Sequence, residues 1–127
     1  GHFANKEEIW DAAYERSVEV WQSIVFEGSR EISHPVERIM CILENDLRNY
    51  IGAEVFRGGC FFFNTLVELS GQSERMALRI LEGYRAFSNL LASWIEEARQ
   101  LGILRTDMDA PEVADFILTA LNGAAAL

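Results

Sequence analysis

The sequence predicts an all-α fold, an antiparallel bundle of about five helices. Apolar residues recur every three to four positions in several long segments, as they do along one face of a helix. Capping residues precede these segments and glycines follow them. No segment reads as a partner strand, and the connections are short enough for antiparallel neighbours. With 127 residues, half of them apolar, the chain suits one domain with its own core.

The first helix is expected from about Asn5 to Glu27. Asn5 is a favourable N-cap, and Glu8, three residues later, completes a capping-box pattern. Apolar and small residues follow at helical spacing along the whole segment. Gly28 should end the helix, because glycine readily adopts the left-handed conformation found just past many helices.

The second helix is expected to begin at Ser33 or His34 and to end near Gly52. Ser33 is the expected cap, and Pro35 falls in the first turn, where its missing N–H costs nothing. After a glycine-rich loop comes CFFFNTLVELSG, residues 60–71. Because the chain lacks a partner strand, we interpret this apolar run as a short central helix.

Two more helices complete the prediction. Ser73 caps the longest one, which keeps a helical period to about Leu101. Asp109 is the next cap, with Glu112 at the capping-box position and Pro111 in the first turn. This last helix runs to the end of the chain and carries several small residues that permit close helix–helix approach.

Composition excludes several classes of function. The formal net charge is −9 and no basic patch is visible, so the chain should bind DNA poorly by itself. No apolar run approaches roughly 18 residues, which argues against a membrane span. No nucleophile elbow, phosphate loop or metal-binding motif is present, and two histidines are too few for a zinc site. We therefore expect no enzyme activity and no cofactor.

The apolar stripes contain many aromatic residues and a few polar ones, the composition of a small-molecule pocket. A plain packed core, with the polar groups satisfied by backbone, would leave the same pattern. If a pocket exists, the expected ligand is small and hydrophobic. Its expected lining is Trp21, Met40, Leu43, Leu47, Tyr50, Phe61, Phe62, Asn64, Thr65, Met76, Ile80, Tyr84, Phe87 and Ser88.

The segment HFANKEEIWDAA resembles the junction between the DNA-binding domain and the first ligand-domain helix of TetR-family transcriptional regulators. The second half resembles such regulators too, through the short helix opening at Gly59-Cys60, the long helix ending in ARQLGILRTDMD, and PEVADFILTALNGA. The residues that match the junction pattern are His2, Phe3, Asn5, Lys6, Glu7 and Ile9.

The resemblance implies a cytoplasmic homodimer that binds operator DNA through an N-terminal helix-turn-helix and a small effector through its C-terminal domain. Residues 1–4 would be the end of that DNA-binding domain, and residues 5–127 the effector-binding and dimerisation domain, with its last helix truncated. Lys6 is the expected contact to a DNA phosphate. The expected dimer interface is Val113, Phe116, Ile117, Ala120, Leu121, Gly123 and Ala124.

The resemblance also implies a mechanism, in which the effector favours a spacing of the DNA-binding domains that no longer matches the operator. The first helix would transmit the change, because it spans from Trp21 to Phe3. The main alternative is a helical interaction or dimerisation module without a ligand. An internal cavity of ligand size, lined by the phenylalanine run at residues 61–63 and by the long helix, would distinguish the two, since the alternative requires a fully packed core.

Overall fold

The computed structural model describes residues 5–54, 73–105 and 107–126, with side chains up to residue 123. Within these ranges every regular element is a helix, which confirms the all-α prediction. The α-helices are α1 (Lys6–Val25), α2 (Pro35–Asn45), α4 (Glu74–Gln100) and α5 (Ala110–Ala126), with the short helices η1 (Ser29–Glu31) and η2 (Asp46–Ile51) between α1 and the gap. The expected helix at 60–71 lies outside the described residues.

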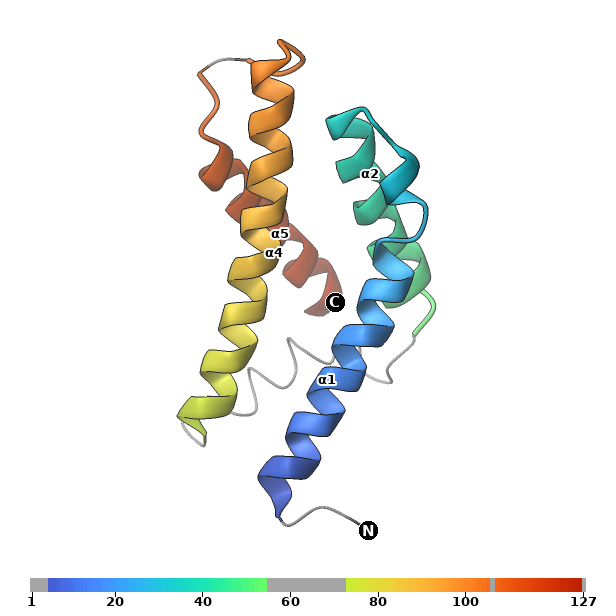
Figure 1. Cartoon of the computed structure of the whole chain (residues 1–127), viewed down its shortest axis with the longest axis vertical. Helices are drawn as coiled ribbons and strands as arrows, with labels where there is room; N and C mark the ends of the chain where they lie inside the picture. Colours follow the sequence, from blue (N-terminus) through green and yellow to red (C-terminus); the bar gives the residue numbers. More distant parts are fainter. Residues whose placement is uncertain (1–4, 55–72, 106, 127) are drawn as a thin grey trace.

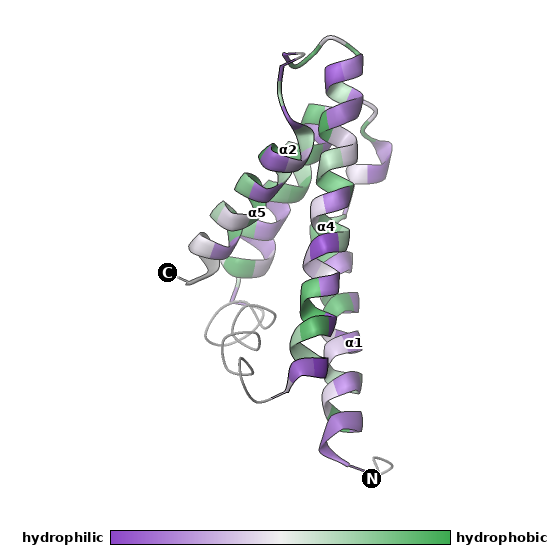
Figure 2. Cartoon of the chain, turned by 90° about the vertical axis from the view of Figure 1, so that its left-hand side faces the viewer, coloured by the Kyte–Doolittle hydropathy of each residue, from purple (hydrophilic) through white to green (hydrophobic). Residues whose placement is uncertain are grey.

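The helices form a bundle in which α4 is the longest member. α2 and α4 run in opposite directions, and α5 turns back from the end of α4 to descend obliquely across it (Figure 1). α4 packs chiefly on α5 and α2, whereas α1 packs chiefly on η2 and α2. The first turns of α1 are hydrophilic, while hydrophobic residues colour much of α2, α4 and α5 (Figure 2). No described helix is both long and apolar enough to cross a bilayer.

Side-chain N-caps begin three of the helices at the predicted residues. The side-chain oxygen of Asn5 accepts the Glu8 N–H at 2.9 Å, and that of Asp109 accepts the Glu112 N–H at 3.0 Å. Ser73 caps α4 in the same manner, by accepting the Met76 N–H at 3.4 Å. These bonds satisfy backbone donors that the first turn of a helix leaves without a partner.

The cap of α2 was predicted one residue too early. His34 is the cap, and its ring Nδ1 accepts the N–H of Glu37 at 3.3 Å. The reason is the position of Pro35, which is the first helical residue and so makes its predecessor the cap. Ser33 lies outside the helix, where its carbonyl oxygen accepts a bond from Arg38 at 3.2 Å.

The core lies where α2, α4 and α5 meet. Its fully buried members include Ile42 on α2, Leu91 and Ile95 on α4, and Ala114 on α5. Ala114 has the smallest side chain of these, and the contact of α4 with α5 is the most extensive helix–helix contact among the described elements. Close packing between these two helices fixes the direction in which α5 leaves α4.

The helix that begins at Pro35 ends at Gly52, as predicted, but its last six residues wind as a π-helix. The Gly52 N–H donates to the Leu47 carbonyl oxygen at 2.9 Å, a bond that spans five residues. A Cβ at residue 52 would stand 2.7 Å from that oxygen, so this closure requires glycine. π-Turns within helices occur frequently at functional sites.

The buried face of this helix differs from the predicted stripe. Ile39, Ile42, Asp46 and Tyr50 are buried at successive turns. Met40 and Leu47 were expected on the inward face, yet they are 58% and 43% exposed. The prediction counted apolar residues only, whereas the inward face includes a carboxylate, Asp46.

Candidate ligand-binding cavity

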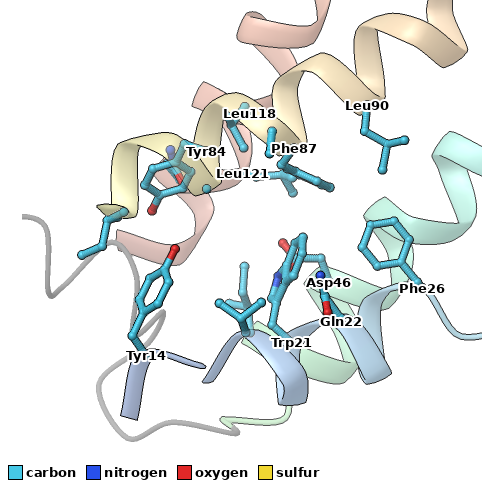
Figure 3. A pocket seen from close by; sticks show the side chains of 16 residues that line it. Tyr14, Trp21, Gln22, Phe26, Asp46, Tyr84, Phe87, Leu90, Leu118 and Leu121 are labelled. Carbon is cyan, nitrogen blue, oxygen red and sulfur yellow. The ribbon is translucent and has the colours of Figure 1, made fainter. Parts of the chain in front are cut away.

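A cavity of about 340 Å³ lies between α1, η2, α4 and α5. Its volume falls in the range of small-molecule sites, which is roughly 300–1,000 Å³. Side chains of α1 point across the space toward those of α4 (Figure 3). The described residues that line it are Tyr14, Val18, Trp21, Gln22, Phe26, Asp46, Ile51, Ile80, Gly83, Tyr84, Ala86, Phe87, Leu90, Leu118, Leu121 and Asn122.

One end of the cavity is walled by an aromatic cluster. The rings of Trp21 and Phe87 meet edge to face, with centroids 4.9 Å apart, and so join α1 to α4. Phe26 packs edge to face on both rings, at 5.6 Å from Trp21 and 6.4 Å from Phe87. Such edge-to-face pairs are favourable beyond the area they bury, so the three rings hold this wall of the cavity in a defined arrangement.

Tyr14 spans the other end of the cavity. Its hydroxyl donates to the backbone carbonyl oxygen of Arg79 at 3.3 Å, and the Arg79 guanidinium lies 4.8 Å from the centre of its ring. A Cβ on Gly83 would stand 2.7 Å from the Tyr14 oxygen, so glycine permits this close approach of α1 to α4. Burial raises the pKa of Tyr14, with Arg79 opposing the shift, and the hydroxyl keeps its proton.

Beyond Tyr14, acidic residues of α1 face arginines of α4. Arg79 pairs with Asp11 at 2.8 Å and with Glu15 at 3.1 Å, and Arg75 also reaches Asp11 at 3.3 Å. Glu7 lies 3.7 Å from Arg75. Exposed pairs of this kind contribute little one by one, but a shared network fixes how the two helices approach. Long side chains therefore hold the first turns of α1 against the start of α4.

Asp46 brings a buried carboxylate to the cavity. Its side chain belongs to the π-helical turn η2 and is only 6% exposed. The Trp21 indole Nε1–H donates to its Oδ1 at 3.1 Å. Burial raises the pKa of Asp46 to about 6 from an ordinary 3.8, and the Trp21 hydrogen bond lowers it only in part.

Four of the predicted lining residues surround the cavity, namely Trp21, Ile80, Tyr84 and Phe87. The exposed Met40 and Leu47 are not among its lining residues. The predicted Phe61, Phe62, Asn64 and Thr65 lie outside the described residues.

The remaining predicted lining residues serve other packing contacts. Tyr50 and Met76 are buried and Leu43 packs against the core, but none of the three lines the cavity. The Ser88 hydroxyl donates to the carboxylate of Asp115 on α5 at 2.7 Å. This bond ties α4 to α5 on the outside of the bundle.

Sequence reasoning missed much of the α1 and α5 contribution. Tyr14 and Val18 belong to the same predicted apolar stripe as Trp21, but of these three only Trp21 was named as a lining residue. Leu121 was predicted at a dimer interface, but it is 8% exposed and lines the cavity. Asp46 lies four residues after Ile42, whose burial is known only from the structure, so no signal in the sequence marked Asp46 as buried.

The other predicted interface residues of α5 fall into two groups. Val113 and Ile117 are half-buried and pack against the core. Phe116 is 75% exposed, and Ala120 and Gly123 are exposed on neighbouring turns. The side chain of Ala124 lies outside the described residues. Lys6 is exposed at the start of α1.

These features define a helical domain built around a ligand-sized cavity. Residues 35–127 match the family described as "Tetracyclin repressor-like, C-terminal domain", so the chain belongs to this family of regulatory domains and the resemblance seen in the sequence is confirmed. α1, which forms one wall of the cavity, precedes the matched segment. Searches of curated proteins and of solved structures found no match. Across the described residues, no group of three or more His, Cys, Asp or Glu could hold a metal ion.

Asp46→Asn should stabilise the protein in a pH-dependent manner. Folding raises the Asp46 pKa, so the folded state keeps a proton that the unfolded chain releases. The resulting stability is complete below the unfolded value and is lost as pH rises through about 6. Between about pH 4.5 and about pH 8 the wild type should lose roughly 2 kcal/mol relative to Asp46→Asn.

Urea unfolding of both proteins at the two pH values measures this difference. Asparagine retains an oxygen that can accept the Trp21 bond, so the variant should fold. Glu44→Gln, on the exposed face of the same helix, is the matched control. A stability gap between Asp46→Asn and wild type that stays constant with pH would contradict the assignment.

Proposed function

We propose that the chain is the effector-sensing and dimerisation domain of a TetR-family transcriptional regulator. The regulator is a cytoplasmic repressor that leaves its operator when a small hydrophobic ligand enters the cavity. The observation that carries this proposal is the 340 Å³ space lined mainly by apolar and aromatic side chains, within a chain of this family. The same space argues against a ligand-free interaction module, which would fill its core.

The course of α1 supports a route from cavity to DNA. Trp21 lines the cavity near one end of the helix, and Lys6 stands at the other end. In the proposed regulator the helix-turn-helix domain precedes Lys6, and residues 1–4 close it. A ligand between α1 and α4 would change how these helices approach, and α1 would carry the change to the DNA-binding domain.

The required energies are modest. To weaken operator binding by tenfold, the ligand needs to favour the released state by about 1.4 kcal/mol. Ion pairs between α1 and α4 are exposed, and such pairs rearrange at low cost. The two arrangements therefore need to differ only in these contacts and in the packing around the ligand.

The exposed face of α5 supports the dimer. Phe116, Ala120 and Gly123 follow one another at intervals of four and three residues, so they share one helix face. An exposed phenylalanine beside two small residues allows a second helix to approach closely. In the proposed dimer this face meets its symmetry mate, while Val113 and Ile117 at its edge pack partly within the chain.

Val18→Trp should abolish ligand binding by filling the cavity. Val18 lines the space from α1, and a larger ring there would occupy the ligand's volume. A thermal-shift screen of hydrophobic compounds against the wild type should find ligands that raise its melting temperature. The same compounds should leave Val18→Trp unchanged.

Val20→Trp is the matched control, because Val20 lies on the same helix and does not line the cavity. It should keep the ligand response. In the longer regulator, the identified ligands should weaken operator binding of Val20→Trp and not of Val18→Trp. Stabilisation of both variants to an equal degree would show that the compounds bind elsewhere.

Phe116→Glu should convert the dimer to a monomer. The side chain is 75% exposed in the single chain, so its loss should leave the fold intact, whereas two glutamates facing each other would repel. Sedimentation velocity measures the state directly. Leu78→Glu, an equally drastic change at an exposed leucine of α4, should remain dimeric. If both variants kept the wild-type state, the α5 interface would be wrong.

A further inference from the structure

Asp46 is a buried acidic residue in a cavity lined mainly by apolar side chains, and apolar packing does not explain why it is there. It is 6% exposed, and within the part of the chain that the structure describes its side chain accepts one hydrogen bond, from Trp21. A carboxylate offers about four acceptor positions, and buried carboxylates are normally paired with a cation or heavily hydrogen-bonded. Among the residues that the structure describes, no recorded salt bridge involves Asp46.

A purely structural role does not require a charge at this position. The Trp21 indole needs an acceptor, and the oxygen of an asparagine would serve it without the cost of burying a carboxylate. The carboxylate therefore weakens the empty domain at neutral pH. A positive charge brought into the cavity would offset this cost, because opposite charges attract strongly where water is excluded.

The surroundings of Asp46 also suit a cation. The described lining residues include no lysine, arginine or histidine that would repel one. Arg79, which packs on the Tyr14 ring, is paired with Asp11 and Glu15, and Arg48, two residues after Asp46, is paired with Glu44. The faces of Trp21 and other aromatic rings attract ammonium groups, and such attraction grows when water is removed.

We propose that the cavity selects a hydrophobic ligand that carries a protonated amine, and that this amine pairs with the Asp46 carboxylate. The inference rests on the proposed function, since it names the chemical class of the effector for the same cavity. The ammonium lies beside Asp46 and the Trp21 indole that donates to it, and Gln22 also lines the cavity (Figure 3). The apolar body extends toward Tyr14 and Tyr84, where Leu118 and Leu121 supply further apolar surface.

A matched set of three compounds tests the charge selection. Naphthylethylamine, naphthylethanol and naphthylpropionate share one apolar body and differ in the charge of the end group. Isothermal titration with the purified chain at about pH 8, where the Asp46 carboxyl is ionised, should show the amine binding at least about tenfold tighter than the alcohol. The carboxylate should bind most weakly, because it repels Asp46.

Asp46→Asn should bind the amine and the alcohol with nearly equal affinity, and its affinity for the alcohol should match that of the wild type. Glu44→Gln is the matched control, because it removes an exposed carboxylate two residues before Asp46. This variant should keep the full preference for the amine. Circular dichroism of both variants establishes that they are folded. The affinity for the alcohol shows whether the cavity is intact. A variant that loses only the charge contact still binds the alcohol like the wild type, whereas a variant that loses the cavity does not.

The possible failures are distinguishable. If the alcohol binds as tightly as the amine, or if the preference persists in Asp46→Asn, the charge selection is overturned while the cavity remains an effector site. If none of the three compounds binds, both the charge selection and the proposed effector site are overturned.

Discussion

The hydrogen bond from the Trp21 indole to the Asp46 carboxylate joins α1 to the π-helical turn that extends α2. The same indole packs edge to face on Phe87, so one side chain connects three elements around the cavity. α1 packs chiefly on η2 and α2 rather than on α4. The space between α1 and α4 consequently depends on this anchor at one end and on Tyr14 with its arginine network at the other. Between these two ends α1 and α4 do not pack directly against each other, and the space left between them is the cavity.

This arrangement combines rigidity and adaptability in different parts of the bundle. The contacts of α4 with α5 and α2 form the core, with Leu91 and Ala114 fully buried, and should change little when a ligand binds. The contacts of α1 with α4 are exposed ion pairs, a close-approaching tyrosine and an aromatic cluster. The proposed function, in which a ligand in the cavity moves one terminal helix, needs this division. A buried carboxylate at the boundary adds sensitivity to charge, which a wholly apolar cavity would lack.

The helices could be predicted from the sequence because their signals are local. The caps at Asn5, Ser73 and Asp109 depend on residues three positions apart, and each was predicted correctly. The inward position of Asp46 was not predictable from apolar periodicity, because a charged residue scores against burial and the π-turn alters the helical period. Val18 could have been assigned to the cavity only by knowing which face of α1 opposes α4. Such facing relations depend on the packing of the whole bundle and leave no trace in any single segment.

The Trp21 indole N–H reports directly on the ionisation of Asp46 inside the cavity. Its resonance, followed by two-dimensional NMR against pH, should shift with a midpoint near the Asp46 pKa of about 6, while the indole of Trp94, beneath the Arg38 guanidinium, should shift little. Saturating naphthylethylamine should lower the Trp21 midpoint by about one unit or more, because a neighbouring cation favours the carboxylate. A midpoint near the ordinary aspartate value, or one that the amine leaves unmoved, would contradict the account.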